Sequence, residues 1–303
     1  MKLGTKNLLT LAELSSKEFA ALIDYSIVLK KELKKGNKQL LKNKTLAMIF
    51  QKPSTRTRVS FETGMFHLGG HTINLSSQDM QLSRGETIED TAKTLSRYVD
   101  CIMARVYDHN LLEKLSDSSS VPVINGLSDS FHPCQILADF MTIKEKKGKF
   151  KGLKIAWIGD GNNVCNSMIY GCALSGTKIY IATPKGFEPD KSVLKESAKS
   201  VEIDLTTDPI KAIKDADVVV TDTYTSIHNN DQKRIKKFLP KYQVNDSLMK
   251  HANSDAIFMH CLPAKRDYEV TSSVIDGSQS VVWDEAENRL HTQKALLISI
   301  IRA

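Results

Sequence analysis

The sequence lacks several features that would place it in other classes of protein. Its five cysteines are odd in number and include no C-x-x-C pair, so we expect a reducing, cytoplasmic setting. No apolar run approaches the about 18–20 residues of a membrane span, and the polar N-terminus has no signal-peptide core. With ordinary composition and no low-complexity segment, the chain is expected to be globular and to bind no membrane.

Aromatic residues are scarce where positive charge gathers, which argues against a nucleic-acid partner. The net charge is +7, and lysines cluster at 30–44, 144–154 and 233–241. Few aromatic side chains lie between them to stack on bases, and no nucleic-acid motif is present. We therefore expect solvated helix faces and loops, whose charge draws small anions toward the protein.

A complete dinucleotide-binding fingerprint is also missing. Residues 158–163 read Ile-Gly-Asp-Gly-Asn-Asn, but Val164 occupies the position of the third glycine. No acidic residue follows about 20 positions on, where residues 181–183 are Ile-Ala-Thr. We expect no NAD and no other cofactor. Asn162 and Asn163 instead suit a helix start, where an amide can hold a substrate carboxylate.

Strand-like runs alternate with amphipathic stretches along all 303 residues, which predicts an α/β fold of two domains. Each domain is expected to be a parallel β-sheet flanked by helices. The strands are expected at 45–50, 71–75, 101–105, 121–124, 153–158, 178–182, 217–221, 255–259 and 280–282. A basic break at 144–152 follows a helix over 135–143, so the domains are expected at 1–147 and 148–290. A C-terminal helix, 291–303, is expected to pack back on the first domain.

The stretch Ser54-Thr55-Arg56-Thr57-Arg58 carries the strongest chemical signal. It lies between the apolar run 45–50 and a predicted helix over 59–68, so unpaired helical N–H groups would point beyond the strand end. With the helix dipole they favour an anion, and Arg56 and Arg58 add donors suited to phosphate. A surface turn with solvated arginines is the alternative. The hydroxyls and the strand-to-helix placement favour a phosphate cradle.

Other polar clusters share this placement at or just after predicted strand ends. They are residues 52–58, 105, 159–163, 222–226 and 260–263, with 132–135 following after a short loop. Ligands of open parallel sheets bind outside the carboxyl ends of the strands. Two such sheets facing one another would bring the clusters to an active site in the cleft between the domains.

His132-Pro133-Cys134-Gln135 predicts a helix start, because proline suits the first helical turn. A lone histidine is most often structural. Together with Arg105, however, His132 could stabilise negative charge that develops on a carbonyl oxygen.

His260-Cys261-Leu262-Pro263 places a thiol directly after a predicted strand, and three interpretations stay open. Cys261 could be buried and inert, could bind zinc with His260 and Cys134, or could contact a substrate. Asp222 ends another strand and is placed to pair with a cationic substrate group. Arg289 adds one more cation near the C-terminus.

Taken together, these motifs resemble the aspartate/ornithine carbamoyltransferase family. The matches are Ser-Thr-Arg-Thr-Arg with Phe61-Glu62, the His-Pro-x-Gln motif at 132–135, and the segments 85–92, 182–186 and 287–295. His-Cys-Leu-Pro at 260–263 marks the ornithine branch. The resemblance runs from about residue 50 to the C-terminus. It implies transfer of the carbamoyl group of carbamoyl phosphate to the side-chain amine of L-ornithine, giving L-citrulline and phosphate, with no metal.

The resemblance also implies a role for each motif residue. Ser54, Thr55, Arg56 and Thr57 would hold the phosphate, and Gln81 would reach a neighbouring subunit. Carbamoyl phosphate would further contact Arg105, His132, Pro133, Cys134, Gln135, Cys261, Leu262 and Arg289. Ornithine would contact Asn163, Asp222, Ser226 and Ile227. Arg105, His132 and Cys261 are the expected catalytic residues. A homotrimer, or a multiple of trimers, with sites at subunit interfaces is implied.

One segment departs from the ornithine branch, which usually carries Ser-Met-Gly where this chain has Ser226-Ile227-His228. Backbone contacts could survive with Ile227, but a glycine can serve positive φ or close approach. Another amine acceptor, such as putrescine or an N-acylated ornithine, therefore remains an alternative. Outside enzymes, a phosphate-sensing protein would share the cradle but would not need His132 or Cys261.

Overall fold

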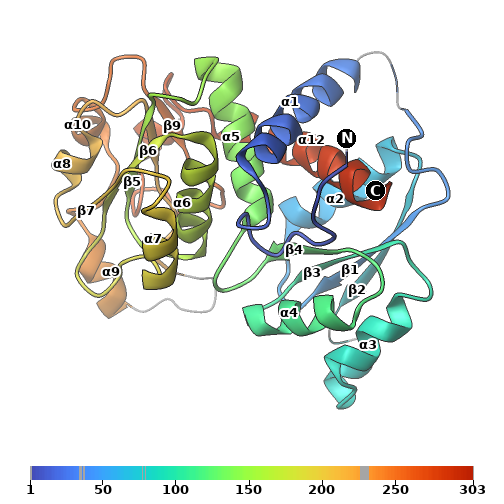
Figure 1. Ribbon diagram of the computed structural model, residues 1–303. Helices are drawn as coiled ribbons and strands as arrows, with labels where there is room; N and C mark the ends of the chain where they lie inside the picture. Colours follow the sequence, from blue (N-terminus) through green and yellow to red (C-terminus); the bar gives the residue numbers. More distant parts are fainter. Residues whose placement is uncertain are drawn as a thin grey trace. The chain divides into compact units, whose positions relative to one another are not determined.

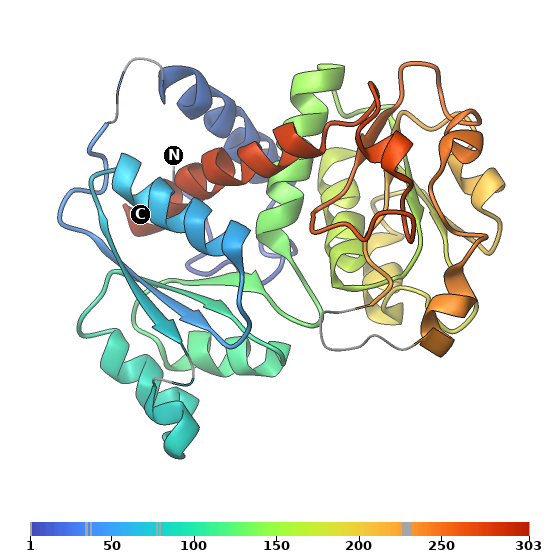
Figure 2. The same ribbon diagram turned by 180° about the vertical axis from the view of Figure 1, so that it is seen from behind.

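The computed structural model describes residues 2–33, 36, 38–76, 78, 80–225 and 232–302, and it contains two compact units (Figures 1 and 2). The first unit comprises Met1–Met141 and Glu287–Ala303, and the second comprises Thr142–Ala286. Both borders fall several residues before the domain borders expected from the sequence. No helix in the described ranges is long and apolar enough to cross a membrane.

The first unit is built on a four-stranded parallel sheet in the order β2-β1-β3-β4. Its strands are β1 (Thr45–Phe50), β2 (His71–Ser76), β3 (Cys101–Arg105) and β4 (Val123–Leu127). The helical elements associated with it are α1 (Ser16–Glu32), α2 (Thr55–His67), η2 (Gln81–Arg84), α3 (Ile88–Leu95), α4 (His109–Ser118), α5 (Pro133–Lys147) and α12 (Val282–Ile301). Both views show α3 and α4 on one face of the sheet, with α1, α2 and α12 on the other. The central strands β1 and β3 are therefore covered on both sides, which is why all their buried residues are apolar.

The second unit has a five-stranded parallel sheet in the order β7-β6-β5-β8-β9. Its strands are β5 (Lys154–Ile158), β6 (Lys178–Ala182), β7 (Ile203–Thr206), β8 (Val218–Val220) and β9 (Ile257–Met259). Its helices are α6 (Asn163–Ser175), α7 (Lys191–Ser197), α8 (Pro209–Ile213), α9 (Gln232–Phe238), α10 (Asp246–Met249) and α11 (Ser272–Ile275). The chain order reverses beside β5, and the carboxyl ends of strands at such a reversal form the usual ligand position in open sheets.

The predicted fold class is confirmed, and the errors lie in individual elements. The strand β7 was missed because it is a short edge strand with no fully buried residue. The strand expected at 280–282 is only an isolated bridge at Ser280, after which α12 begins at Val282. The expected strand 121–124 is shifted to Val123–Leu127. The helix expected over 135–143 spans Pro133–Lys147 instead, so Lys144, Lys146 and Lys147 of the basic run lie in its last turn, where their charge interacts favourably with the helix dipole.

Candidate active site

The residues predicted to form a phosphate cradle lie at the start of α2, a few residues after β1 ends. Ser54 is the N-cap residue, and its hydroxyl accepts the Thr57 N–H at 3.3 Å. The first turn of α2 contains no acidic residue. The remaining N–H groups and the helix dipole therefore favour an anion without a competing carboxylate on this turn.

The two arginines predicted for the cradle have different surroundings. Arg58 is exposed, and its Nε lies 3.0 Å from Glu62 Oε1, one helical turn away. The same guanidinium lies 2.8 Å from the side-chain amide of Asn74 on β2. Residues two positions apart on a helix point about 200° away from each other. Assigning Arg58 to the cradle was therefore wrong, whereas Arg56 is half-buried and lies close enough to His132 to lower its pKa.

Two further arginines meet at the hydroxyl of Thr57, which is buried. Arg105 ends β3 opposite Phe50 of β1, and its Nη1 lies 3.4 Å from Thr57 Oγ1. Arg289 comes from α12, and its Nη2 lies 3.3 Å from the same oxygen. Arg289 is 2% exposed, so its charge is held in a low-dielectric setting where an anion binds strongly.

His132 completes the cluster as a neutral imidazole. Burial lowers its pKa well below the usual value, and the positive charges of Arg289, Arg105 and Arg56 lower it further. Pro133 opens α5 directly after it, as the sequence predicted. A neutral imidazole can donate a hydrogen bond to a carbonyl oxygen without adding a charge. We call Ser54, Arg56, Thr57, Arg105, His132, Gln135 and Arg289 the anion site.

Gln135 links the anion site to the buried carboxylate of Asp139, which was not predicted as a site residue. Its Oε1 accepts from Arg289 Nη1 at 2.8 Å, and its Nε2 donates to Asp139 Oδ1 at 2.8 Å. The signal in the sequence was the spacing of four between two polar residues in the otherwise apolar stretch 133–141.

Three other residues predicted for this site, Cys134, Thr55 and Gln81, differ in burial. Cys134 is buried, its thiol donates to the Asn125 carbonyl at 3.4 Å, and burial raises its pKa to about 11. Its side chain therefore stays protonated in the core. Thr55 is the first residue of α2 and is exposed, and Gln81 is exposed in η2.

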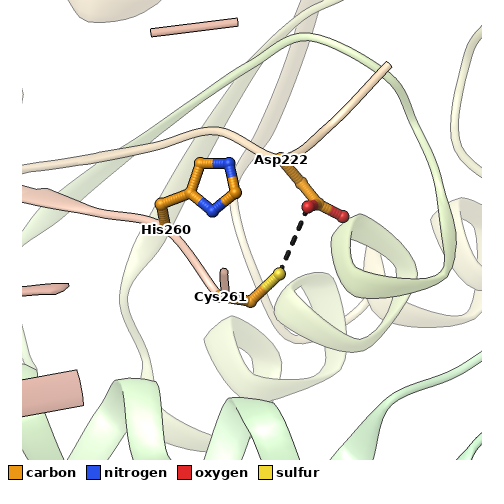
Figure 3. Close-up of side chains that lie close together, drawn as sticks. All are labelled: Asp222, His260 and Cys261. Carbon is orange, nitrogen blue, oxygen red and sulfur yellow. Dashed lines mark hydrogen bonds between the residues drawn. The ribbon is translucent and has the colours of Figure 1, made fainter. Parts of the chain in front are cut away.

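The second unit gathers its polar residues after β5, β8 and β9, which are adjacent in the sheet. Asp222 follows β8 and Cys261 follows β9, and Cys261 Sγ donates to Asp222 Oδ1 at 3.2 Å (Figure 3). Asn162 Nδ2 donates to the other Asp222 oxygen at 2.7 Å. Asp222 is buried, so these hydrogen bonds hold its carboxylate in a fixed orientation. We call Asp222, Cys261 and Asn163 the thiol–carboxylate site.

Asn162 is not available for a substrate carboxylate in the way the sequence suggested. It is the N-cap of α6, and its Oδ1 accepts the N–H groups of Val164 and Cys165. Because its amide nitrogen binds Asp222, both ends of the side chain have structural partners. Asn163, the next residue, is half-buried at the first position of α6.

An ion pair beside this site was also missed. Asp160 and Arg234 form a charge-assisted hydrogen bond, and Arg234 Nε donates to the Tyr224 carbonyl at 2.6 Å. Burial raises the pKa of Asp160 to about 6, although Arg234 opposes the shift, and the nearby Asp222 carboxylate adds to it. Because Arg234 offsets the charge of Asp160, Asp222 is the carboxylate here that suits a cationic ligand group.

The structure argues against zinc at His260 and Cys261. The ligand atoms of Asp222, His260 and Cys261 lie within 4.8 Å of one another, and Figure 3 shows them side by side. However, His260 Nδ1 accepts the Leu262 N–H at 2.9 Å, and its Nε2 faces Glu269 Oε1 at 3.2 Å. Both ring nitrogens are thus occupied by protein groups. The ring instead fixes the turn at Leu262, whose φ of 57° lies in the left-handed region.

The remaining predicted residues, Ser226 and Ile227, lie outside the described residues together with His228. The departure from the Ser-Met-Gly motif therefore has no structural account.

Comparison with known proteins identifies the family. Residues 6–145 match the aspartate/ornithine carbamoyltransferase carbamoyl-P binding domain, and residues 151–300 match the Asp/Orn binding domain. The chain belongs to the aspartate/ornithine carbamoyltransferase family.

Similar relatives come from the ornithine branch. The chain is 62% identical to the ornithine carbamoyltransferase of Cenarchaeum symbiosum over 303 residues, covering 99% of each chain. It is 53% identical to the anabolic ornithine carbamoyltransferase of Pyrococcus furiosus over 311 residues, covering 99% of this chain and 98% of the relative. The solved structure of the Pyrococcus furiosus enzyme matches with a TM-score of 0.95, covering 98% of this chain and 97% of that one.

Proposed function

We propose that this enzyme transfers the carbamoyl group of carbamoyl phosphate to the side-chain amine of L-ornithine, giving L-citrulline and phosphate. The observation that carries the proposal is the anion site, where α2 and three arginines adjoin a neutral His132 and an oriented Gln135. A phosphate-sensing protein needs only the cationic half of this arrangement. The neutral donor and the amide match the carbamoyl half of the substrate.

In the proposed reaction, the anion site stabilises both the leaving group and the charge that develops on the carbonyl. The N-terminus of α2, Ser54, Thr55, Arg56 and Thr57 hold the phosphate. Arg105 and His132 donate to the carbonyl oxygen as it becomes a tetrahedral oxyanion, and losing one such donor typically costs about 3 kcal/mol. The amine nitrogen bonds to the carbonyl carbon, the bond from carbon to the phosphate oxygen breaks, and the proton that the amine loses passes to the departing phosphate. No covalent enzyme intermediate is needed.

The thiol–carboxylate site is proposed to bind ornithine. An alkyl amine with a pKa near 10 is neutral in only about one molecule per thousand at pH 7, so the site must favour the free base. Asp222 pairs with the α-amino group, which leaves the side-chain amine uncharged beside Cys261. Asn163, Ser226 and Ile227 bind the amino-acid end, and the Leu262 carbonyl accepts from the carbamoyl amide.

We also infer a homotrimer, or a multiple of trimers, in the cytoplasm. Gln81, which is exposed, would then reach the site of a neighbouring subunit. Exposed apolar side chains on α2, with Phe66 at 74% and Val59 at 53%, support a protein partner on this face. The five free cysteines support a reducing setting.

The test is a colorimetric assay of ureido products with carbamoyl phosphate and four acceptors: ornithine, putrescine, N-acetylornithine and aspartate. We expect product with ornithine and background signal with the other three. Turnover of another acceptor in place of ornithine would overturn the specificity while leaving the chemistry intact. Binding of phosphate without any product would favour the phosphate-sensing alternative. Light scattering of the same preparation tests the trimer.

A further inference from the structure

Asp139 is a buried carboxylate that no step of the proposed transfer uses. It is 1% exposed and lies on α5, one helical turn after Gln135. Burying a carboxylate is costly unless hydrogen bonds compensate for the lost water. Its position beneath the anion site therefore needs an explanation that the transfer mechanism does not give.

The hydrogen bonds around Gln135 fix the orientation of its amide. A carboxylate can only accept and a guanidinium can only donate, so the amide nitrogen must face Asp139 and the amide oxygen must face Arg289. Both contacts are 2.8 Å long. In the reverse orientation the amide nitrogen would face the Arg289 guanidinium, donor against donor, and the amide oxygen would face the Asp139 carboxylate, acceptor against acceptor. These two mismatches cost more free energy than either hydrogen bond contributes.

This orientation gives the anion site an acceptor among its donors. Arg105, Arg289 and neutral His132 can donate to phosphate and carbonyl oxygens, whereas Gln135 presents a carbonyl oxygen. An amide oxygen can accept two hydrogen bonds, so it can accept from a ligand N–H alongside Arg289. A carbamoyl group has such an N–H group, and an acetyl group of the same shape has a methyl group there instead.

We infer that Asp139 is a positioning residue that makes the anion site selective for an acyl phosphate with an N–H group, that is, for carbamoyl over acetyl phosphate. The inference rests on the proposed function, because it takes Gln135 as the partner of the carbamoyl nitrogen. Asp139 touches neither substrate. It acts by holding the Gln135 nitrogen, so that only the oxygen of that amide faces the ligand.

The experiment compares Asp139→Leu, which removes the acceptor at similar volume, with Asp139→Asn, which keeps an acceptor oxygen but removes the charge. For each enzyme we would measure KM for carbamoyl phosphate and the inhibition constants of acetyl phosphate and inorganic phosphate. We expect Asp139→Leu to raise KM at least tenfold while both inhibition constants stay within about twofold. Asp139→Asn should stay within about threefold of the parent for all three ligands. Ser26→Ala, which removes a buried hydroxyl bonded to the Leu22 carbonyl, is the control for a general loss of packing.

Three outcomes would overturn the inference. The first is an unchanged preference for carbamoyl over acetyl phosphate in Asp139→Leu. The second is an equal loss for all three ligands, which indicates general damage. The third is an equal loss in Asp139→Asn and Asp139→Leu, which indicates charge rather than a hydrogen bond. If Asp139→Leu does not fold by circular dichroism, Asp139→Ala takes its place in the same comparison.

The failure of the proposed function gives a different result. A parent enzyme that shows no preference for carbamoyl phosphate, or forms no citrulline, contradicts the proposed function itself. A parent enzyme whose preference survives in Asp139→Leu contradicts only the role of Asp139.

Discussion

The two units place sites of opposite charge at the carboxyl ends of parallel sheets. In the first unit, Arg105 and Arg289 converge on the Thr57 hydroxyl, and a helix N-terminus adds to their field. In the second unit, the Asp222 carboxylate is held by Asn162 and Cys261, with Asp160 close by. The same architecture can therefore bind either an anion or a cation, because the charge of the site comes from the few residues that follow each strand.

This difference in charge also predicts which groups make each unit selective for its own ligand. A cluster of guanidiniums binds any small oxyanion, so selectivity in the first unit must come from neutral groups such as His132 and Gln135. A carboxylate binds any cation, so selectivity in the second unit must come from the shape and hydrogen bonds around Asp222. Mutations that separate charge from hydrogen bonding test this division.

The largest expected effect is at Arg56, with Arg58 as its matched control on the same helix. We expect Arg56→Gln to lower kcat/KM for carbamoyl phosphate at least a thousandfold, because it removes a cation of the cradle in both the ground state and the transition state. Arg58→Gln should change kcat/KM less than threefold, since Arg58 pairs with Glu62 at the surface. Steady-state kinetics of the two variants decides this, and a near-normal Arg56→Gln enzyme would contradict the cradle assignment.

The next largest effect is expected at His132, and it distinguishes the role of a neutral hydrogen-bond donor from that of the arginines. We expect His132→Gln to retain phosphate affinity within about twofold and to lower kcat by about 10²- to 10³-fold, the usual loss for one oxyanion donor. Inhibition by phosphate measures the affinity, and saturating kinetics measures kcat. If phosphate affinity fell as much as kcat, His132 would belong to the phosphate cradle rather than to the carbonyl group.

A smaller effect is expected in the second unit. Cys261→Ala should raise KM for ornithine about tenfold with little change in KM for carbamoyl phosphate, because the thiol donates to Asp222, the carboxylate proposed to bind ornithine. Cys261→Ser keeps a hydrogen-bond donor and should lie between the parent and the alanine variant. A rise in KM for carbamoyl phosphate instead would place the thiol on the other substrate.

The smallest effect is an opposite response of the two sites to pH. The pKa of His132 is lowered on folding, so the unfolded chain binds more protons below about pH 6.5 and stability falls as the solution is acidified. The pKa of Asp160 is raised to about 6, so its burial costs stability as the pH rises through that value. Urea unfolding between pH 7.5 and 5 measures the free energy of unfolding. On acidification this free energy should fall less in His132→Gln than in the parent, and it should fall more in Asp160→Asn. Identical slopes in all three proteins would contradict both assignments.

Sequence patterns predicted correctly those elements that have a local signature in the sequence. The buried strands β1 and β3 are continuous apolar runs, and the turn at Ser54 has the residues that an anion-binding helix start needs. Both could therefore be found without knowing the fold. The exposed edge strand β7 has no such signature, because only one side of its backbone is paired within the sheet.

The errors at the site have a different origin. Whether Arg58 faces the cradle depends on where α2 begins, which was predicted four residues too late. Asn162 was assigned to a substrate because an N-cap residue and a ligand-binding residue look alike in sequence. The spacing of Gln135 and Asp139 indicates that they share a helix face, but it does not show that Gln135 joins Asp139 to Arg289, which lies more than 140 positions away in the sequence.

The position of Arg289 on α12 has a consequence for synthesis of the chain. The first unit contains residues 1–141 and 287–303, so the ribosome makes the whole second unit before it makes the last helix of the first. At about 5–20 residues per second, the nascent first unit waits roughly 7 to 30 seconds for α12. During that interval Gln135 and Thr57 have no Arg289 to bind, and the apolar surface that Ala295, Leu296 and Leu297 later help to bury is uncovered. A nascent chain can therefore complete its anion site only after α12 has been made, which makes this interval the time when the protein most needs a chaperone.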